Sequence, residues 1–427
     1  MVLIMHASPV FSQQLYPVNL ETILKLAGAN NLTIKEYKLH YDEALAAQNK
    51  AQEWWLPNLY AGATAHFLNG PTMNTDGAFF SSNLKTDNFW GGLGVVAEID
   101  FSKGIYNSLA AKQSAEAIQY QGVAERNNAI LKVLTTYFDL QTAQLKYQFL
   151  QNLVAQADSI TQEIQVKMKA GMLYQSDYLM AQSNYKHLKN ELLKTKTEWE
   201  KQSAALANLV NLQSNVSLFS ADTLLLPLKI SENIVDTSIY SNGFVKRPEY
   251  EGLNCELRSF EIARKTVNQG LFFPKLRISF DNGSLGTYGI ASNGTYPFNT
   301  AVGASIIWNI PLGRFTYNGD LKKYDSQILL QQNKMEQFKN QFKEEVYIAN
   351  EQLLSANEQM INAKEALQES TEALNESIQR QKLGTARPFE VFQAQEFNLQ
   401  SLVDYLESVA EYNKAQYALY IAMGNNL

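Results

Sequence analysis

Alternation of apolar and polar residues predicts four β-strands in this chain of 427 residues. They lie near residues 58–67 and 92–101 in the first half and 275–281 and 301–310 in the second half. Successive side chains on a strand point to opposite faces, so each predicted strand has one apolar and one polar face. Runs of about ten residues match a tilted strand that crosses a bilayer. A soluble sheet with one buried face explains the alternation equally well, and the strands alone leave this choice open.

Aromatic residues gather near the ends of these strands, where they suit the headgroup level of a membrane. They are Trp54, Trp55, Phe89, Trp90, Phe272, Phe273, Phe298 and Trp308. The loops 68–88 and 285–297 are rich in small polar residues and are predicted to face water. In a membrane, we expect the apolar positions to face lipid, namely Leu59, Ala63, Val95, Ile99, Ile278 and Val302. The charged positions Glu98, Asp100, Arg277 and Asp281 are then expected in the lumen or near its rim.

Two long stretches lack the residues that stop helices. Proline is absent from residues 72–226 and 312–387. Gly122 is the only glycine between Gly104 and Gly171, and none lies between Gly319 and Gly384. We predict continuous helices over residues 106–169 and 319–382, each of ~64 residues and ~96 Å. In the second helix, apolar residues recur every seven positions and form a narrow seam of coiled-coil type. The seam consists of Leu353, Met360, Leu367 and Leu374.

Shorter helices flank the long ones, and their summed lengths suggest how they pack. They are predicted near residues 19–53, 176–211, 247–271 and 389–423. Two short helices placed end to end equal roughly one long helix at the same rise per residue. We therefore expect each pair to run beside a long helix, with both glycine turns at the same end.

The chain repeats itself once. Leu56-Pro57-Asn58-Leu59 returns as Phe273-Pro274-Lys275-Leu276, and the turn at Gly171 returns at Gly384. The spacing is 217 residues from Pro57 to Pro274, 209 from Gly104 to Gly313 and 213 from Gly171 to Gly384. We predict a signal-peptide remnant at residues 1–12, a first repeat at 13–212, a linker at 213–246 and a second repeat at 247–427. Each repeat contains a short helix, a strand hairpin (56–101 or 274–310), a long helix and a return helix.

Composition narrows the function classes. The net charge of −6 argues against a nucleic-acid partner, because no basic stripe is present to replace phosphate counterions. The sequence contains no apolar run of ~20 residues, so it predicts no transmembrane helix. A single cysteine excludes an intrachain disulfide and a cysteine metal cluster. The four histidines have neither ligand spacing nor a nucleophile partner, so we predict no enzyme activity, no metal and no cofactor.

The order of strand hairpin, long helix, glycine turn and return helix, all present twice, resembles the TolC family of outer-membrane efflux ducts. The residues that carry the resemblance extend from Val18 to Gly424. They include Pro57-Asn58-Leu59, Pro274-Lys275-Leu276, Gly104, Ile310-Pro311-Leu312-Gly313-Arg314, Ser176-Asp177, Ala181-Gln182, Leu383-Gly384-Thr385, Ala394-Gln395, Leu209-Val210-Asn211-Leu212 and Ala422-Met423-Gly424. Several relatives carry an acylated N-terminal cysteine, and this sequence does not.

The resemblance implies a mixed α and β fold with two tandem repeats and four transmembrane strands per chain. A homotrimer would build a twelve-stranded barrel in the outer membrane of a Gram-negative bacterium. Below it, long coiled-coil helices would form an α-barrel in the periplasm, and residues 213–246 would form an equatorial belt. The implied partners are outer-membrane lipid, a periplasmic adaptor (a membrane fusion protein) and an inner-membrane pump of a tripartite efflux or type I secretion system.

The two glycine turns are the predicted adaptor-docking tips. They comprise Gly171, Met172 and Leu173 in the first repeat and Gly384, Thr385, Ala386 and Arg387 in the second. The chain path places both turns farthest from the strands. Glycine at such a turn is also explained by its backbone conformation alone, because it accepts a positive φ.

An acidic stripe on the second long helix is the predicted pore constriction. Glu358, Glu365 and Glu372 are seven residues apart, with Glu369 and Glu376 beside them. The resemblance adds that the family carries an acidic ring about three turns before the tip, which points to Glu369, Glu372, Asn375 and Glu376 here. A charged stripe opposite an apolar seam is also typical of a solvated face.

A periplasmic coiled-coil scaffold or adaptor without a membrane barrel is the alternative function. It would use the helices and leave the strands and their aromatic ends unexplained. Detergent dependence of the pure protein separates these two functions.

Overall fold

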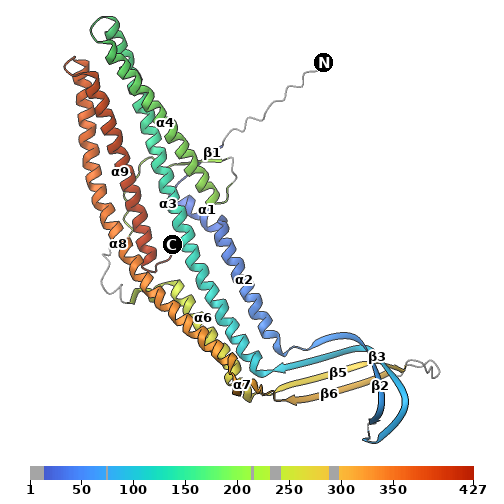
Figure 1. Ribbon diagram of the computed structural model, residues 1–427. Coiled ribbons are helices and arrows are strands. Elements are labelled where there is room, and N and C mark those ends of the chain that lie inside the picture. Colours follow the sequence, from blue (N-terminus) through green and yellow to red (C-terminus); the bar gives the residue numbers. More distant parts are fainter. Residues whose placement is uncertain (1–13, 74–75, 213–215, 231–241, 288–297) are drawn as a thin grey trace, which may run out of the picture. The chain divides into compact units, whose positions relative to one another are not determined.

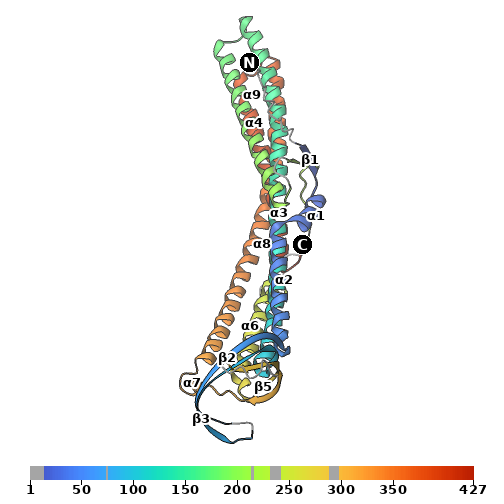
Figure 2. The ribbon, with the colours of Figure 1, turned by 90° about the vertical axis from the view of Figure 1, so that its right-hand side faces the viewer.

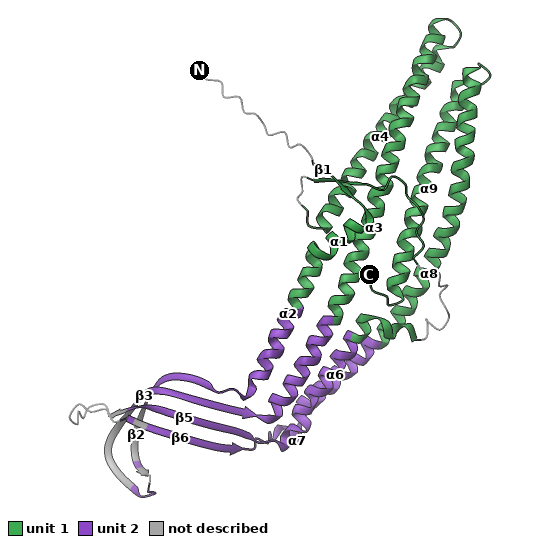
Figure 3. Cartoon of the chain, turned by 180° about the vertical axis from the view of Figure 1, so that it is seen from behind, with its two compact units in different colours: residues 1–40, 120–251, 336–427 green, residues 41–119, 252–335 purple. Residues whose placement is uncertain are grey.

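The computed structural model describes residues 14–73, 76–212, 216–230, 242–287 and 298–427. The predicted signal remnant at 1–12 lies outside the described residues, as does part of the predicted linker. The chain divides into two compact units (Figure 3). Unit 1 comprises residues 1–40, 120–251 and 336–427, and unit 2 comprises residues 41–119 and 252–335. Each unit therefore contains parts of both predicted repeats.

Each half of the chain contains a strand hairpin followed by a long helix and a return helix (Figure 1). The helices are α1 (Leu20–Asn30), α2 (Leu32–Gln52), α3 (Phe101–Lys169), α4 (Gln175–Leu209), α6 (Pro248–Asn268), α7 (Gly313–Thr316), α8 (Gly319–Lys382) and α9 (Pro388–Ala422). The strands are β1 (Gln14–Val18), β2 (Asn58–Met73), β3 (Phe79–Asp100), β4 (Val216–Ser220), β5 (Lys275–Thr287) and β6 (Phe298–Ile307). Short 3₁₀ turns occupy Glu53–Trp55, Gly243–Lys246 and Gly270–Phe272.

The long helices confirm the prediction from missing helix breakers. α8 spans the predicted residues, whereas α3 begins five residues earlier than expected. It starts directly after β3 because the Asp100 carboxylate accepts a hydrogen bond from the Lys103 N–H at 3.0 Å. Such a side-chain acceptor satisfies one of the free N–H groups of a helix start.

The predicted helix at 19–53 is wrong in one respect, because it is broken at Asn31. The Asn31 side-chain oxygen accepts hydrogen bonds from the N–H groups of Thr33 (2.9 Å) and Ile34 (3.2 Å). Asparagine competes with the helix in this way, so α1 ends and α2 begins there. No helix in the described part of the chain is long and apolar enough to cross a membrane.

Unit 2 contains a four-stranded sheet of order β2-β3-β5-β6, in which all neighbours are antiparallel. The predicted loop at 68–88 is wrong, because β2 and β3 continue through it as far as the pair Met73 and Phe79. Small polar residues allow this extension, since strand pairing needs only backbone groups. Of the other predicted loop, residues 285–287 belong to β5, and 288–297 lie outside the described residues.

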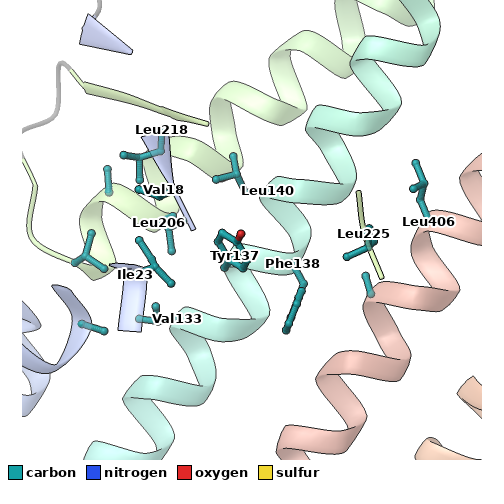
Figure 4. Packing of buried hydrophobic residues seen from close by; sticks show 14 of the residues in the cluster. Val18, Ile23, Val133, Tyr137, Phe138, Leu140, Leu206, Leu218, Leu225 and Leu406 are labelled. Atoms are coloured by element: carbon teal, nitrogen blue, oxygen red, sulfur yellow. The ribbon is translucent and has the colours of Figure 1, made fainter. Parts of the chain in front are cut away.

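The largest apolar core lies in unit 1 and joins α1, α3, α4, α9 and β4 (Figure 4). Tyr137 of α3 is 1% exposed there and donates a hydrogen bond to the Asp222 carboxylate at 2.5 Å. Burial and the neighbouring Asp222 raise the pKa of this phenol above its usual range, so it remains a donor. β1 and β4 form a parallel pair in the same unit.

Side-chain amides fasten the segment that contains β4 to two helices of unit 1. Gln144 of α3 accepts from the Ser220 N–H at 2.7 Å and donates to the Ser220 carbonyl at 3.0 Å. Asn413 of α9 does the same for the Leu228 N–H (2.8 Å) and the Leu226 carbonyl (3.0 Å). Because these amides are buried, each bond satisfies polar groups that would otherwise cost free energy.

The short helices meet end to end in unit 1, as predicted. The Asn31 amide donates to the Leu209 carbonyl at the end of α4 (2.7 Å), and the Arg247 guanidinium donates to the Ala422 carbonyl at the end of α9 (3.1 Å). Leu209 and Ala422 are 213 residues apart. Both joints therefore occupy the same place in the two repeats.

Candidate functional site

The two faces of the unit 2 sheet differ in character. Leu59, Val95, Phe280 and Val302 lie side by side across the four strands, and alternate positions along each strand share their face. All six residues predicted to face lipid lie on this face. Its large side chains are widely exposed in the chain, with Leu59 and Val302 each at 75%.

The opposite face carries the charged residues predicted for the lumen, and most of them form ion pairs between neighbouring strands. Lys275 lies 3.0 Å from Asp100, and Arg277 lies 3.6 Å from Glu98, in each case between directly opposed positions of β5 and β3. Asp281 accepts a hydrogen bond from the Tyr60 hydroxyl. This face, called the polar face below, is therefore close to electrically neutral.

The two helix tips of unit 1 share one backbone geometry. Gly171 and Gly384 have φ of 74° and 76°, in the left-handed region that favours glycine. The following residue in each tip, Met172 or Thr385, donates its N–H to a carbonyl five residues back at 2.9 Å. These bonds close the ends of α3 and α8 in the manner of a Schellman motif.

The return helices also begin alike. The Asp177 carboxylate accepts from the Tyr174 N–H at 3.1 Å, and the Glu390 carboxylate accepts from the Arg387 N–H at 3.2 Å. Both turns lie at the same end of unit 1 in the two views (Figures 1 and 2). A shared apolar cluster links them, formed by Ile160, Ile164, Ala181, Leu374, Val391 and Phe392.

The predicted tip residues divide into exposed and packed ones. Gly171, Met172, Gly384, Thr385 and Arg387 are exposed, and Met172 is 74% exposed. Leu173 instead packs against the shared apolar cluster, and Ala386 is half-buried. The outer surface of the tips is thus made by the exposed residues.

The predicted constriction residues lie on one exposed side of α8. Glu369, Glu372, Asn375 and Glu376 are all exposed, as are Glu358 and Glu365. The seam residue Leu374 is 6% exposed and lies in the shared apolar cluster. Among the described residues, no cation lies within ion-pairing distance of these five glutamates. The nearby Arg380 pairs instead with Glu390 at 3.7 Å.

Residues 23–212, which cover most of the first repeat, match the family model "Outer membrane efflux protein". Solved structures share the fold of nearly the whole chain. The fold of the chain is TolC-like. By sequence, its first repeat is similar to the outer membrane efflux protein family.

Three solved relatives illustrate the TolC-like fold. The CmeC outer membrane channel of Campylobacter jejuni is 18% identical with a TM-score of 0.76, over 95% of this chain and 85% of that chain. VceC of Vibrio cholerae is 15% identical (TM-score 0.72; 95% and 96% covered), and the open-state MtrE channel of Neisseria gonorrhoeae is 17% identical (0.72; 94% and 88%). Among curated proteins, none matches the sequence.

Sequence reasoning missed several surface residues of this TolC-like chain. Tyr174 and Leu383 are 80% and 79% exposed beside the tips. The signal in the sequence is a large apolar or aromatic residue beside a glycine turn, as at Tyr174 and Leu383. The cross-strand pairing of Tyr60 with Asp281 was also missed, because it joins residues 221 positions apart.

Proposed function

We propose that three copies of this chain form a passive export duct in the outer membrane of a Gram-negative bacterium. Their sheets would close into a twelve-stranded barrel, and their helices would continue it as a tunnel in the periplasm. A periplasmic adaptor and an inner-membrane pump would complete a tripartite efflux or type I secretion system. The pump supplies the energy, because a tunnel needs no bond chemistry of its own.

One observation carries this proposal: the sheet has an exposed apolar face and two open edges. Within the described residues, β2 and β6 each pair on one side only. Unpaired backbone groups are not tolerated in lipid, so the edges must pair with other copies. Eight strands from two copies would fill with side chains, whereas twelve strands from three copies leave a passage. A coiled-coil scaffold or adaptor would not need the exposed apolar face.

Native mass spectrometry of the protein purified in detergent tests the assembly. We expect a complex of three chains that is lost when detergent is removed. A soluble monomer without detergent would contradict the proposal.

A pair of neighbouring substitutions tests which face meets lipid. Ala63 lies on the apolar face and Thr64 on the polar face of β2. Arginine at a lipid-facing position near the membrane centre costs ~2–4 kcal/mol, so Ala63→Arg should reduce trimer yield. Thr64→Arg is the matched control and should assemble normally. The opposite result would reverse the two faces.

The tips are the proposed docking surface for the adaptor. Because Leu173 is packed, the exposed and repeat-equivalent Met172 and Thr385 are better probes. Met172→Arg with Thr385→Arg should abolish export while trimers remain intact. Gln148→Arg, on an exposed position of α3 away from the tip, is the control. Dye accumulation in cells that depend on this chain gives the measurement, and full export by the tip variant would remove the docking role.

Glu369, Glu372, Asn375 and Glu376 are the proposed lining of the narrow part of the tunnel. Three copies would repeat these groups around one axis. Closely spaced carboxylates attract cations, so the tunnel should prefer them.

A further inference from the structure

In one row of the polar face, glycines occupy three of the four strands. Gly62, Gly92 and Gly283 are directly opposed on β2, β3 and β5, so three neighbouring strands carry no side chain there. Gly94 adds a fourth glycine on the next position of β3 that shares this face. Glycine weakens a strand and often marks a place where another group approaches the backbone closely.

Two aromatic residues occupy the space that these glycines leave. A Cβ atom at Gly94 would overlap the Tyr60 ring, and a Cβ atom at Gly283 would lie 2.6 Å from the indole nitrogen of Trp90. A Cβ atom at Gly92 would lie 2.9 Å from the same indole. Both rings therefore lie against the backbone of the neighbouring strands. At Gly94 a side chain would displace the Tyr60 ring, whereas at Gly92 and Gly283 it would meet backbone atoms of the neighbouring strand as well as the Trp90 indole.

The Tyr60 ring is held in place by its hydroxyl. That group donates to Asp281, which lies beyond Gly94 on β5. The ring thus crosses β3, and 37% of Tyr60 remains exposed. A ring fixed at both ends loses little further freedom when something binds to it.

The charge around the rings is negative. The charges cancel within each of the two acid–base pairs of the polar face, whereas Asp281 accepts a hydrogen bond from the neutral Tyr60 hydroxyl. Among the described residues, no cation lies within ion-pairing distance of Asp281. Aromatic faces beside an uncompensated carboxylate favour cations, and flat apolar groups stack on them as well.

We propose that Tyr60 and Trp90 form a binding site for aromatic organic cations on the inner wall of the barrel. This inference rests on the proposed function, which turns the polar face inward. Three copies then place six rings around the passage, and cargo with aromatic rings and a positive charge is retained there. The rings act as a specificity-determining surface for what passes.

Current block in planar bilayers tests the site with two probes of equal charge. Tetraphenylphosphonium carries aromatic rings, and tetrabutylammonium carries aliphatic chains. The wild-type trimer should be blocked more strongly by tetraphenylphosphonium. Trp90→Leu and Tyr60→Leu should each weaken that block by about three- to tenfold, as expected for loss of a cation–π contact, and leave the aliphatic block unchanged.

Two further variants separate the ring from other effects. Tyr60→Phe keeps the ring and should keep most of the aromatic block. Phe280→Leu removes a ring from the apolar face and should change neither block.

The outcomes distinguish the site from the duct itself. Conducting trimers that are blocked equally by both probes would overturn the aromatic site and leave the duct intact. Leucine variants that melt at lower temperature with unchanged block would show that the rings only cover the glycines. A wild-type chain that forms no conducting trimer would overturn the duct and the site together.

Discussion

The last turns of α3 and α8 share one backbone geometry but differ in how their charged side chains pair. Lys167 and Glu163 in α3 correspond to Arg380 and Glu376 in α8, each pair of equivalents being 213 residues apart. Lys167 pairs with Glu163 at 2.7 Å along its own helix. Arg380 instead reaches Glu390 of α9 at 3.7 Å. Glu376 is therefore left without the partner that its equivalent has.

The difference shows how a duplicated element can acquire a separate role without a change of fold. In α3 the positions equivalent to Glu369 and Glu372 are Gln156 and Ser159, and the remaining carboxylate is paired. In α8, none of the acids Glu369, Glu372 and Glu376 has an ion-pair partner among the described residues. On the polar face of the sheet, two ion pairs cancel in charge and, among the described residues, Asp281 is the carboxylate left without a cation. The negative surplus of the proposed tunnel is thus concentrated on the second repeat.

Removing the unpaired negative charges of α8 should have the largest effect on the preference for cations. Glu372→Gln with Glu376→Gln should lower the preference for cations over anions by about fivefold, roughly the factor that one unit charge exerts at ~4 Å in water. Block by multivalent cations should weaken with it. Single-channel recordings with and without a trivalent cation give both numbers.

A matched control comes from the sheet. Glu98→Gln with Arg277→Gln removes a paired couple and should leave the cation preference unchanged. If the Glu372→Gln, Glu376→Gln variant also kept its selectivity, the acidic stripe would be only a solvated helix face.

Breaking the pair in α3 should create a second acidic position. Lys167→Gln removes the cation beside Glu163, so the first repeat becomes more like the second. We expect a moderate rise in cation preference, since three carboxylates per trimer lose their partners. The same recordings measure it. A fall in cation preference would mean that Glu163 does not face the passage.

Releasing Arg380 should have the smallest effect. Glu390→Gln keeps an oxygen that can accept the Arg387 N–H, and it removes the charge that draws Arg380 to α9. Arg380 is then free to pair with Glu376, four residues earlier on the same helix, as Lys167 does with Glu163. Cation preference should decrease slightly.

Asp177→Asn is the control for this change. It alters the equivalent acid at the start of α4, where no arginine pairs with it among the described residues. Its recordings should match the wild type. An equal decrease of the cation preference in both variants would mean that the altered helix starts, and not the release of Arg380, cause the change.

The sequence predicted features that depend on local chemistry. The bounds of α8 followed from Gly319, Gly384 and the lack of proline between them. The turn glycines at 171 and 384 have the positive φ that their position after a long helix indicated. The break at Asn31 was missed, because asparagine stops a helix only where its side chain finds neighbouring N–H groups.

Features that join distant residues could not be predicted from the sequence. β3 and β5 are separated in the sequence by almost half of the chain. The pairing of Glu98 with Arg277 could therefore not be predicted from the sequence. The glycines at 62, 92 and 283 lie far apart in the sequence and form a row only in the sheet. The partner of Arg380 was equally hidden, because its nearest acid in the sequence is not the one that it contacts.

The reversal potential of the purified trimer across a potassium chloride gradient tests the central claim most directly. The account predicts a potential shifted toward the potassium equilibrium value, which shrinks in the Glu372→Gln, Glu376→Gln variant and persists in the Glu98→Gln, Arg277→Gln variant. A reversal potential that is zero, favours chloride, or depends on the sheet pair and not on α8 would contradict it.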